Sequence, residues 1–212
     1  MPTTLTTIRA RVRQDLNDED SANYRWTDND LDRHIAQAVR ELSIELPRQR
    51  KSTLATVSGS RDISVATLTE RLSIEAVEWP TGNYPPTYVR FQTWIDTLTL
   101  LTDAAGDGTN TAVYWLSLHT LDATSSTLDA WAEDLVAVGA EAYAGLEWAS
   151  YAINRANVGD DAAGRYRRDA EARLQQFQDG LRRLGRAGSL RSTNLYRPAD
   201  LKPSQTTDPG PG

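Results

Sequence analysis

Residues 24–42 read YRWTDNDLDRHIAQAVREL and carry the clearest structural signal in the chain. Thr27 stands where a helix N-cap belongs, and Asp30 follows it by three residues. This spacing is typical of a capping box, in which Thr27 accepts a backbone N–H and Asp30 reaches back to the cap. The aspartates at positions 28, 30 and 32 place negative charge at the positive end of the helix dipole. The stretch therefore predicts a helix that begins at residue 28.

The same stretch has one apolar face. Trp26 precedes the cap and is positioned to contact Leu31 in the first turn. Apolar side chains then recur at intervals of three and four residues, as a buried helix face requires. They are Leu31, Ile35, Ala38, Val39 and Leu42. Pro47 ends the pattern, so the helix is predicted to cover residues 28–46.

A shorter helix is predicted before it, over residues 4–17, with an apolar stripe of Leu5, Ile8, Val12 and Leu16. Its arginines, Arg9, Arg11 and Arg13, are expected to point outward. The connector Asn17-Asp18-Glu19-Asp20-Ser21 is polar. Acids adjacent in sequence seldom converge on one ion, so we expect a solvated loop here and not a divalent-cation site. Two helices joined by a short loop are expected to pack antiparallel.

Residues 53–121 change character, because Thr, Val, Ile, Trp and Tyr alternate there between turn residues. This pattern predicts strands at 53–57, 63–65, 72–80, 88–92, 97–101 and 112–118. Short turns and loops separate them, including the Gly- and Asp-rich segment 103–110. The block is predicted to be a small antiparallel sheet or sandwich.

Helical periodicity returns near Thr127 and Asp129. A third helix is predicted with the apolar positions Trp131, Leu135, Val138, Ala142, Leu146, Ala149 and Ile153. Alanine and glycine make this helix thin, so a neighbour can approach it closely, within the subunit or between subunits. A fourth helix is predicted over 161–184, and residues 190–212, rich in proline, are predicted to form a flexible tail.

The predicted fold is therefore α+β and mainly helical: a bundle of about four helices with an inserted small antiparallel β sheet or sandwich and a flexible C-terminal tail. The helical bundle is expected to comprise residues 1–51 and 123–189, and the inserted β domain residues 52–122. The tail, 190–212, is a candidate portal-binding segment in the light of the resemblance described below.

Composition narrows the classes of function. The chain has 212 residues, of which 39% are hydrophobic and 25% charged, as in globular proteins. Its net charge of −6 disfavours non-specific capture of nucleic acid. It has no cysteine and two histidines, which leaves few soft metal ligands. The N-terminus lacks the basic and apolar regions of a signal peptide, and no apolar run is long enough for a membrane span.

Three segments in this order resemble the head-to-tail adaptor (connector or neck) proteins of long-tailed bacteriophages. They are residues 24–46, the strand 113–121 that ends in Trp115 and His119, and the alanine-rich helix 128–151. The resemblance spans residues 5–185 and includes no catalytic signature. It implies a structural virion protein that forms a ring, typically dodecameric, beneath the portal. It also implies that the C-terminal part reaches the portal, the β region meets the next neck or tail protein, and double-stranded DNA passes through without specific binding.

Enzymatic and metal sites are weakly indicated. Asp28, Asp30 and Asp32 lack the Gly and Glu that a calcium-binding EF-hand needs further on, so we interpret them as helix-capping residues. His34 and His119 lack a nucleophilic partner motif, and Glu75/Glu78 is a carboxylate pair that chance alone provides. We therefore expect no enzyme activity, no cofactor and no metal.

Candidate partner-binding residues concentrate near the C-terminus: Arg182, Arg183, Arg186, Arg191, Leu195, Tyr196 and Leu201. The arginines could dock on an acidic protein surface, or simply form a solvated helix face paired with nearby acids. The three apolar tail residues could anchor a segment that orders on binding. By the resemblance, the partner is the portal.

The sequence thus favours an adaptor in the virion neck, assembled in the host cytoplasm, with no membrane partner. Two alternatives remain open. One is another neck or tail-completion protein of the stopper type, and the other is a monomeric cellular module that binds proteins through its β block.

Overall fold

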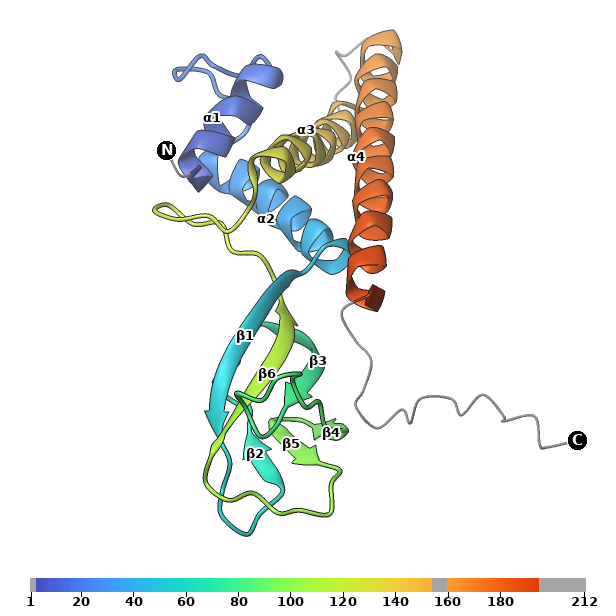
Figure 1. Ribbon diagram of the computed structural model, residues 1–212. Coiled ribbons are helices and arrows are strands. Elements are labelled where there is room, and N and C mark those ends of the chain that lie inside the picture. Colours follow the sequence, from blue (N-terminus) through green and yellow to red (C-terminus); the bar gives the residue numbers. More distant parts are fainter. Residues whose placement is uncertain (1–2, 154–159, 195–212) are drawn as a thin grey trace, which may run out of the picture. The chain divides into compact units, whose positions relative to one another are not determined.

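The computed structural model describes residues 3–153 and 160–194 (Figure 1). The contacts divide the chain into two compact units. The helical unit comprises residues up to 48 together with residues 118–189, and the β unit comprises residues 49–117. Four helices and two antiparallel three-stranded sheets give the α+β fold that the sequence predicts.

Helices α1 (Leu5–Asp15) and α2 (Asp28–Glu45) both begin at capped positions. The Thr4 side chain accepts the N–H of Thr7. Thr27 and Asp30 form both bonds of a capping box, with Asp30 N donating to Thr27 Oγ1 at 3.2 Å and Thr27 N to Asp30 Oδ2 at 3.0 Å. The apolar stripes of the two helices lie in the core of the helical unit, as the 3/4 spacing predicts.

Helix α3 (Ala130–Ile153) is the central helix of this unit. Its buried residues include Ala132, Val136, Ala137, Glu141 and Ala142, which point to several sides of the helix and not along one stripe. The predicted stripe is therefore wrong at its first position, because Trp131 is 43% exposed. A helix that is apolar all round gives periodicity no single face to detect. None of the described helices is long and apolar enough to cross a membrane.

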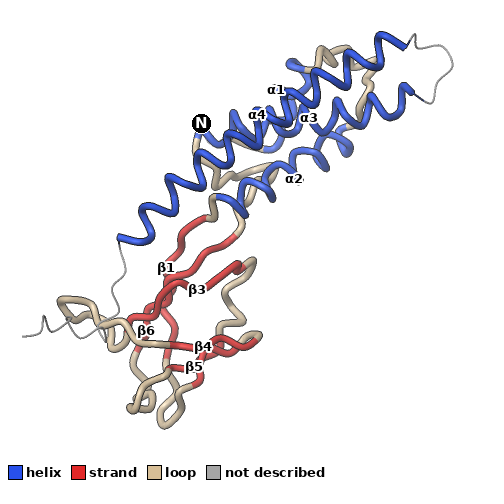
Figure 2. Tube along the Cα trace, turned by 90° about the vertical axis from the view of Figure 1, so that its right-hand side faces the viewer, coloured by secondary structure: helices blue, strands red, loops and turns tan. Residues whose placement is uncertain are grey.

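Helix α4 (Asp160–Asn194) lies along α3 at close range (Figure 2). Gly139 faces the Phe177 ring, Gly145 faces Ala170, and Gly180 faces Leu135. A Cβ atom at these glycines would come within 2.9, 2.9 and 2.6 Å of the facing atoms. Residues of increasing number along α3 contact residues of decreasing number along α4, so the two helices run antiparallel. The thin α3 therefore accepts its close neighbour within the subunit.

The C-terminal end of α4 lies beyond its predicted end at residue 184. The helix runs through Gly185 and Gly188 to Asn194, and so covers residues 190–194, which the sequence assigns to the tail. Glycine inside a helix costs only about 1 kcal/mol relative to alanine, which neighbouring residues can offset. Residues 195–212 lie outside the described residues.

The β unit contains two sheets (Figure 1). One has the order β1 (Arg48–Ala55), β6 (Asn110–Ser117), β3 (Arg71–Glu78), and the other β2 (Asp62–Ser64), β5 (Thr97–Leu100), β4 (Phe91–Trp94). In the first sheet, Val77 is opposite Val113, and in the second Ile63 is opposite Leu98. These four side chains belong to one apolar core together with Trp79 and Trp115.

Two predicted strands differ from the structure. Strand β1 begins at Arg48 and not at residue 53, since its first residues are basic and do not show alternation. Arg50 lies over the Trp115 ring at 4.6 Å and Lys51 over the Tyr114 ring at 4.9 Å, so basic side chains cover aromatic surface here. The strand predicted at 88–92 begins at Phe91, because Tyr88 makes only an isolated bridge with Glu78.

We expect Gly145→Ala to lower the free energy of unfolding by about 1–2 kcal/mol. The added methyl group would meet the Ala170 Cβ, which cannot rotate away, and overpacking of this kind outweighs the better helix propensity of alanine. Urea denaturation followed by circular dichroism measures the change. The matched control is Gly164→Ala on α4, where the nearest atom, Arg168 Nη1, is 3.5 Å away. Equal stability of the two variants would contradict the close contact.

Candidate partner-binding surfaces

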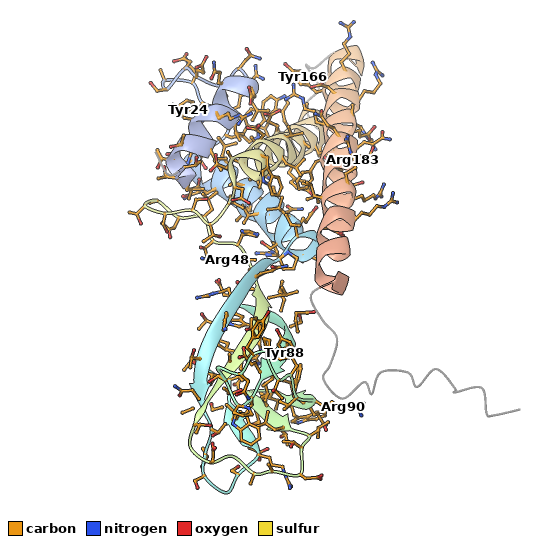
Figure 3. All side chains as sticks on the ribbon, viewed as in Figure 1. Tyr24, Arg48, Tyr88, Arg90, Tyr166 and Arg183 are labelled. Atoms are coloured by element: carbon orange, nitrogen blue, oxygen red, sulfur yellow. The ribbon has the colours of Figure 1, made fainter. Side chains whose placement is uncertain are left out.

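The arginines predicted to bind a partner form a basic face on the second half of α4, made of Arg182, Arg183 and Arg186 (Figure 3 labels Arg183). Arg182 Nη1 donates to Asp179 Oδ1 at 3.3 Å, and Arg183 Nε donates to the Asp179 carbonyl at 3.2 Å. All three side chains are exposed, and Asp179 is the one acid in the segment 179–186. The basic face therefore presents positive charge to solvent.

The other predicted partner residues are not placed by the structure. Arg191 belongs to α4, but its side chain is outside the described part. Leu195, Tyr196 and Leu201 lie beyond the described residues altogether. The structure thus brings Arg182, Arg183 and Arg186 together and leaves the remaining four as predictions.

The motif at the start of α2 belongs to a cluster of aromatic residues. Trp26 is 5% exposed, and its ring meets that of Trp148 edge to face, with centroids 5.9 Å apart. Leu31 is fully buried in the same core. Trp148 in turn contacts Tyr151 at 5.4 Å. The motif therefore joins the start of α2 to α3.

A buried ion pair holds the connection between α1 and α2. Asn17 adopts the left-handed conformation with φ of 52°, and the N–H of Asp18 donates to the Arg13 carbonyl at 2.8 Å. This helix-ending turn brings the Asp18 carboxylate back over α1, where Arg13 Nη1 donates to it at 2.6 Å. Arg13 is 6% exposed and Asp18 is 4% exposed. Two expectations are therefore wrong: Arg13 does not point outward, and Asp18 is not a solvated loop residue.

Further bonds complete this network. Arg13 Nη2 donates to the Trp26 carbonyl at 3.0 Å and to Asp28 Oδ1 at 2.7 Å. Asp28 also accepts a bond from Arg9. The hydrogen bond from Arg13, followed by the charge of Arg9, lowers the pKa of Asp28 below its usual value. Tyr24 lies over the Arg13 guanidinium at 3.6 Å (Figure 3). Asp28, which the sequence assigns to helix capping, thus also binds the buried cation.

A small pocket, which we call the aromatic–acidic pocket, lies beside this junction and has a volume of about 100 Å³. Three kinds of side chain line it. Its carboxylates are Asp15, Glu141 and Asp169, its arginines are Arg25 and Arg173, and its rings are Trp26, Trp148 and Tyr166 (Figure 3 labels Tyr166). They come from α1, the α1–α2 connector, α3 and α4. Sequence reasoning missed this pocket.

Glu141 is the buried acid of the pocket, at 6% exposure. Arg173 donates to it and also pairs with Asp169 at 3.2 Å. Burial, and next the hydrogen bond shared with Asp15, raise the pKa of Glu141 to about 7, although the charge of Arg173 opposes this. The Glu141 carboxyl is therefore only partly ionised in neutral solution.

The histidines and the predicted carboxylate pair have structural partners. His34 Nε2 lies 2.6 Å from Glu147 Oε2, and the ring nitrogens of His119 lie 3.0 Å and 3.1 Å from the carbonyls of Thr127 and Leu46. The Glu78 carboxylate accepts the Tyr114 hydroxyl at 2.8 Å. Within the described ranges, no group of three or more histidines and acids is arranged to hold a metal ion.

Two further exposed groups were not singled out by the sequence. Trp94 and Ile95, at the β4–β5 turn, are 74% and 79% exposed, and Ile95 has a φ of 52°, which is rare for a β-branched residue. Ile44 on α2 is 61% exposed and comes one turn after the exposed Arg40. Periodicity could have indicated Ile44, since it lies outside the α2 stripe, whereas the Ile95 conformation has no sequence signal.

A family model described as SU10 adaptor protein matches residues 3–200, which is nearly the whole chain. No curated protein matches the sequence.

We expect Asp18→Asn to lower the free energy of unfolding by about 1–3 kcal/mol, because it removes the buried carboxylate of the Arg13 pair and leaves the more exposed Asp28 as the remaining counter-charge. Chemical denaturation measures the loss. The control is Glu19→Gln at the neighbouring exposed position, which should change stability by less than about 0.5 kcal/mol. Similar values for both variants would show that the ion pair does not stabilise the connection.

Stability should also fall as the pH rises from about 5 to 8. The pKa of Glu141 is about 7 in the folded chain against an ordinary value of 4.5, so the folded state binds more protons between these values and loses that advantage above them. The loss should be on the order of 1–3 kcal/mol. Glu141→Gln should remove this part of the pH dependence, and Glu133→Gln on the same helix should keep it. Equal pH profiles for the wild type and Glu141→Gln would contradict the assignment.

Proposed function

The chain belongs to the SU10 adaptor protein family, and from this membership we propose that it is a structural virion protein that joins the head of a bacteriophage to its tail. The match over residues 3–200 is the observation that carries the proposal. In the proposed assembly, copies of the chain form a ring, dodecameric by analogy, beneath the portal. The ring is a component of the neck of the virion and assembles in the host cytoplasm.

The portal contact is proposed for the C-terminal part of the chain. The basic face of Arg182, Arg183 and Arg186 supports it, because an exposed cluster of arginines at a helix end suits an acidic protein surface. Arg191 and the apolar residues Leu195, Tyr196 and Leu201 follow in the sequence and would anchor the portal contact. The β unit would then meet the next neck or tail protein, for which the exposed Trp94 and Ile95 are suitable contacts.

Passage of double-stranded DNA without specific binding is a further part of the proposal. The net charge of −6 supports it, since a negative lumen repels phosphates and lets the duplex slide. A strongly basic lumen in an assembled ring would contradict this part.

We expect deletion of residues 186–212 to abolish binding to the portal encoded by the same genome while the helical unit stays folded. Co-sedimentation measures binding, and circular dichroism with thermal melting measures folding. The core contacts of α4 that were described above, at Gly139, Gly145 and Leu135, involve positions before residue 186, so the truncated chain should keep them.

A second variant keeps the full chain length. Arg182→Glu combined with Arg183→Glu should weaken portal binding at least tenfold, about 1.4 kcal/mol, because it reverses the charge of the basic face. Arg167→Glu is the matched control, since Arg167 is exposed on the first half of the same helix. Unchanged portal binding by both the deletion and the double variant would overturn the proposed contact. A wild-type chain that ignores the portal would favour a stopper-type neck protein or a cellular binding module.

A further inference from the structure

The outer edge of strand β1 is open in the β unit. In the sheet order β1-β6-β3, strand β1 is an outer strand, and no other segment of the described chain forms backbone hydrogen bonds with the free side of residues 49–55. The edge of β3 differs, because two register shifts interrupt its pairing with β6. Its last residues are also covered, since the Val77 carbonyl accepts the N–H of Val89, and the N–H of Trp79 donates to Thr87. Strand β1 is therefore the regular edge to which another strand can add.

The pairing of β1 with β6 determines which backbone groups face outward. Both strands have eight residues, and the N–H of Thr56 donates to the Thr109 carbonyl at 2.9 Å just beyond one end of the pair. In the other half of the pair, Arg50 lies over the ring of Trp115. As the residue number falls from 56 to 50 on one strand, it rises from 109 to 115 on the other. The pairing is therefore antiparallel and contains no bulge between these positions.

In an antiparallel pair, every second residue directs both its N–H and its C=O toward the partner strand. Because Thr56 donates to β6, residues 50, 52 and 54 face β6 in the same way. The N–H and C=O groups of the residues between them face outward, and each of these residues is exposed: Gln49, Lys51, Thr53 and Ala55. The free edge thus offers four regularly spaced donors and four acceptors.

The edge is also basic. Residues 46–61 include four basic residues and no acid, although the net charge of the chain is −6. Charged side chains can protect an edge by lying across it, but Arg50 and Lys51 lie over aromatic rings of β6, on opposite faces of the sheet. They therefore leave the backbone of the edge clear. Lys51 pairs with Glu78 at 3.7 Å, whereas Arg50 has no carboxylate partner in the part of the chain that is described.

We propose that β1 binds an extended acidic segment of another neck protein, which adds as a fourth strand to the sheet β1-β6-β3. The outward backbone groups would supply the hydrogen bonds, and the basic residues would select glutamate or aspartate on the added strand. Repulsion between like charges disfavours β1 of a second copy as the added strand, and such a pair would be a two-fold dimer that does not extend into a ring. The inference rests on the proposed function and gives the chemistry of the partner that the β unit binds.

A proline at position 53 tests the edge in the full chain. Thr53→Pro removes an outward N–H but no bond to β6, so it should block strand addition and leave the sheet folded. Thr53→Ala keeps the N–H and is the matched control. The probe is a fluorescent peptide of about seven residues in which threonine and glutamate alternate. It should bind the wild type and Thr53→Ala with a dissociation constant below about 1 mM, and Thr53→Pro at least about tenfold more weakly, as measured by fluorescence anisotropy.

The same peptide with lysine in place of glutamate tests the charge. It should bind the wild type at least about tenfold more weakly than the acidic peptide. Thermal melting confirms that each variant is folded.

Hydrogen exchange measured by NMR locates the bound peptide. In the free chain, the amides of residues 49, 51, 53 and 55 should exchange faster than those of residues 50, 52 and 54. Saturation with the acidic peptide should slow exchange of the first set at least about tenfold, because these amides then donate to the added strand. A polyanion such as duplex DNA that bound through charge alone would not protect alternate amides.

Four outcomes would overturn the inference. They are an acidic peptide that does not bind at about 1 mM, equal binding of the two peptides, equal binding by Thr53→Pro and Thr53→Ala, and outward amides that a second copy already protects without peptide. If the chain joins the neck or tail proteins of its own genome while these amides still exchange freely, the edge contact is refuted and the adaptor proposal stands. If it binds the acidic peptide at β1 but ignores every such protein and the portal, the edge stands and the adaptor proposal fails.

Discussion

The close approach of α3 and α4 is the constraint on which the helical unit depends. Gly139, Gly145 and Gly180 leave no room for a Cβ atom at three points along the contact. Because α3 is thin, α1, α2 and α4 can all pack on it, and most of its middle part is buried. The large core side chains come from its neighbours, with Phe177 from α4 and Leu31 and Ile35 from α2. The position of α4, and with it the basic face and one wall of the aromatic–acidic pocket, follows from this packing.

The sequence predicted helices and strands well where their formation depends on residues that are close together in the chain. The capping box of Thr27 and Asp30 and the apolar spacing of α2 involve residues within one or two turns, so they can be read from the chain itself. Arg13 and Asp18 could not be predicted in this way. Their burial depends on the left-handed turn at Asn17, which reverses the chain and brings a carboxylate back over the helix before it. The buried residues of α3 lie on several sides of the helix, so no single apolar stripe predicts them. The basic residues at the start of β1 do not alternate with apolar ones, so the pattern of a strand is absent there.

Of the candidate binding surfaces, one could be predicted from the sequence and one could not. The arginines of the basic face are neighbours in sequence, so composition alone found them. The aromatic–acidic pocket combines residues near positions 15, 25, 145 and 170, and no local pattern links such distant positions. Its charge also cannot be inferred from the net charge of the chain, because burial raises the pKa of Glu141 to about 7. Family membership gives the biological setting, whereas the pocket is made of side chains that only the folded chain brings together.

The close glycine contacts between the antiparallel helices α3 and α4 limit which substitutions can occur in related sequences. Each close pair shares a fixed space between two helices, so the sizes of its two members are not free to change separately. A relative that carries alanine at the position of Gly145 should carry glycine at that of Ala170, and a larger residue at that of Gly180 should accompany a smaller one at that of Leu135. Aligned relatives should therefore show paired changes of volume, rising on one helix where they fall on the other. Such covariation would record the helix contact in sequences whose structures have never been determined.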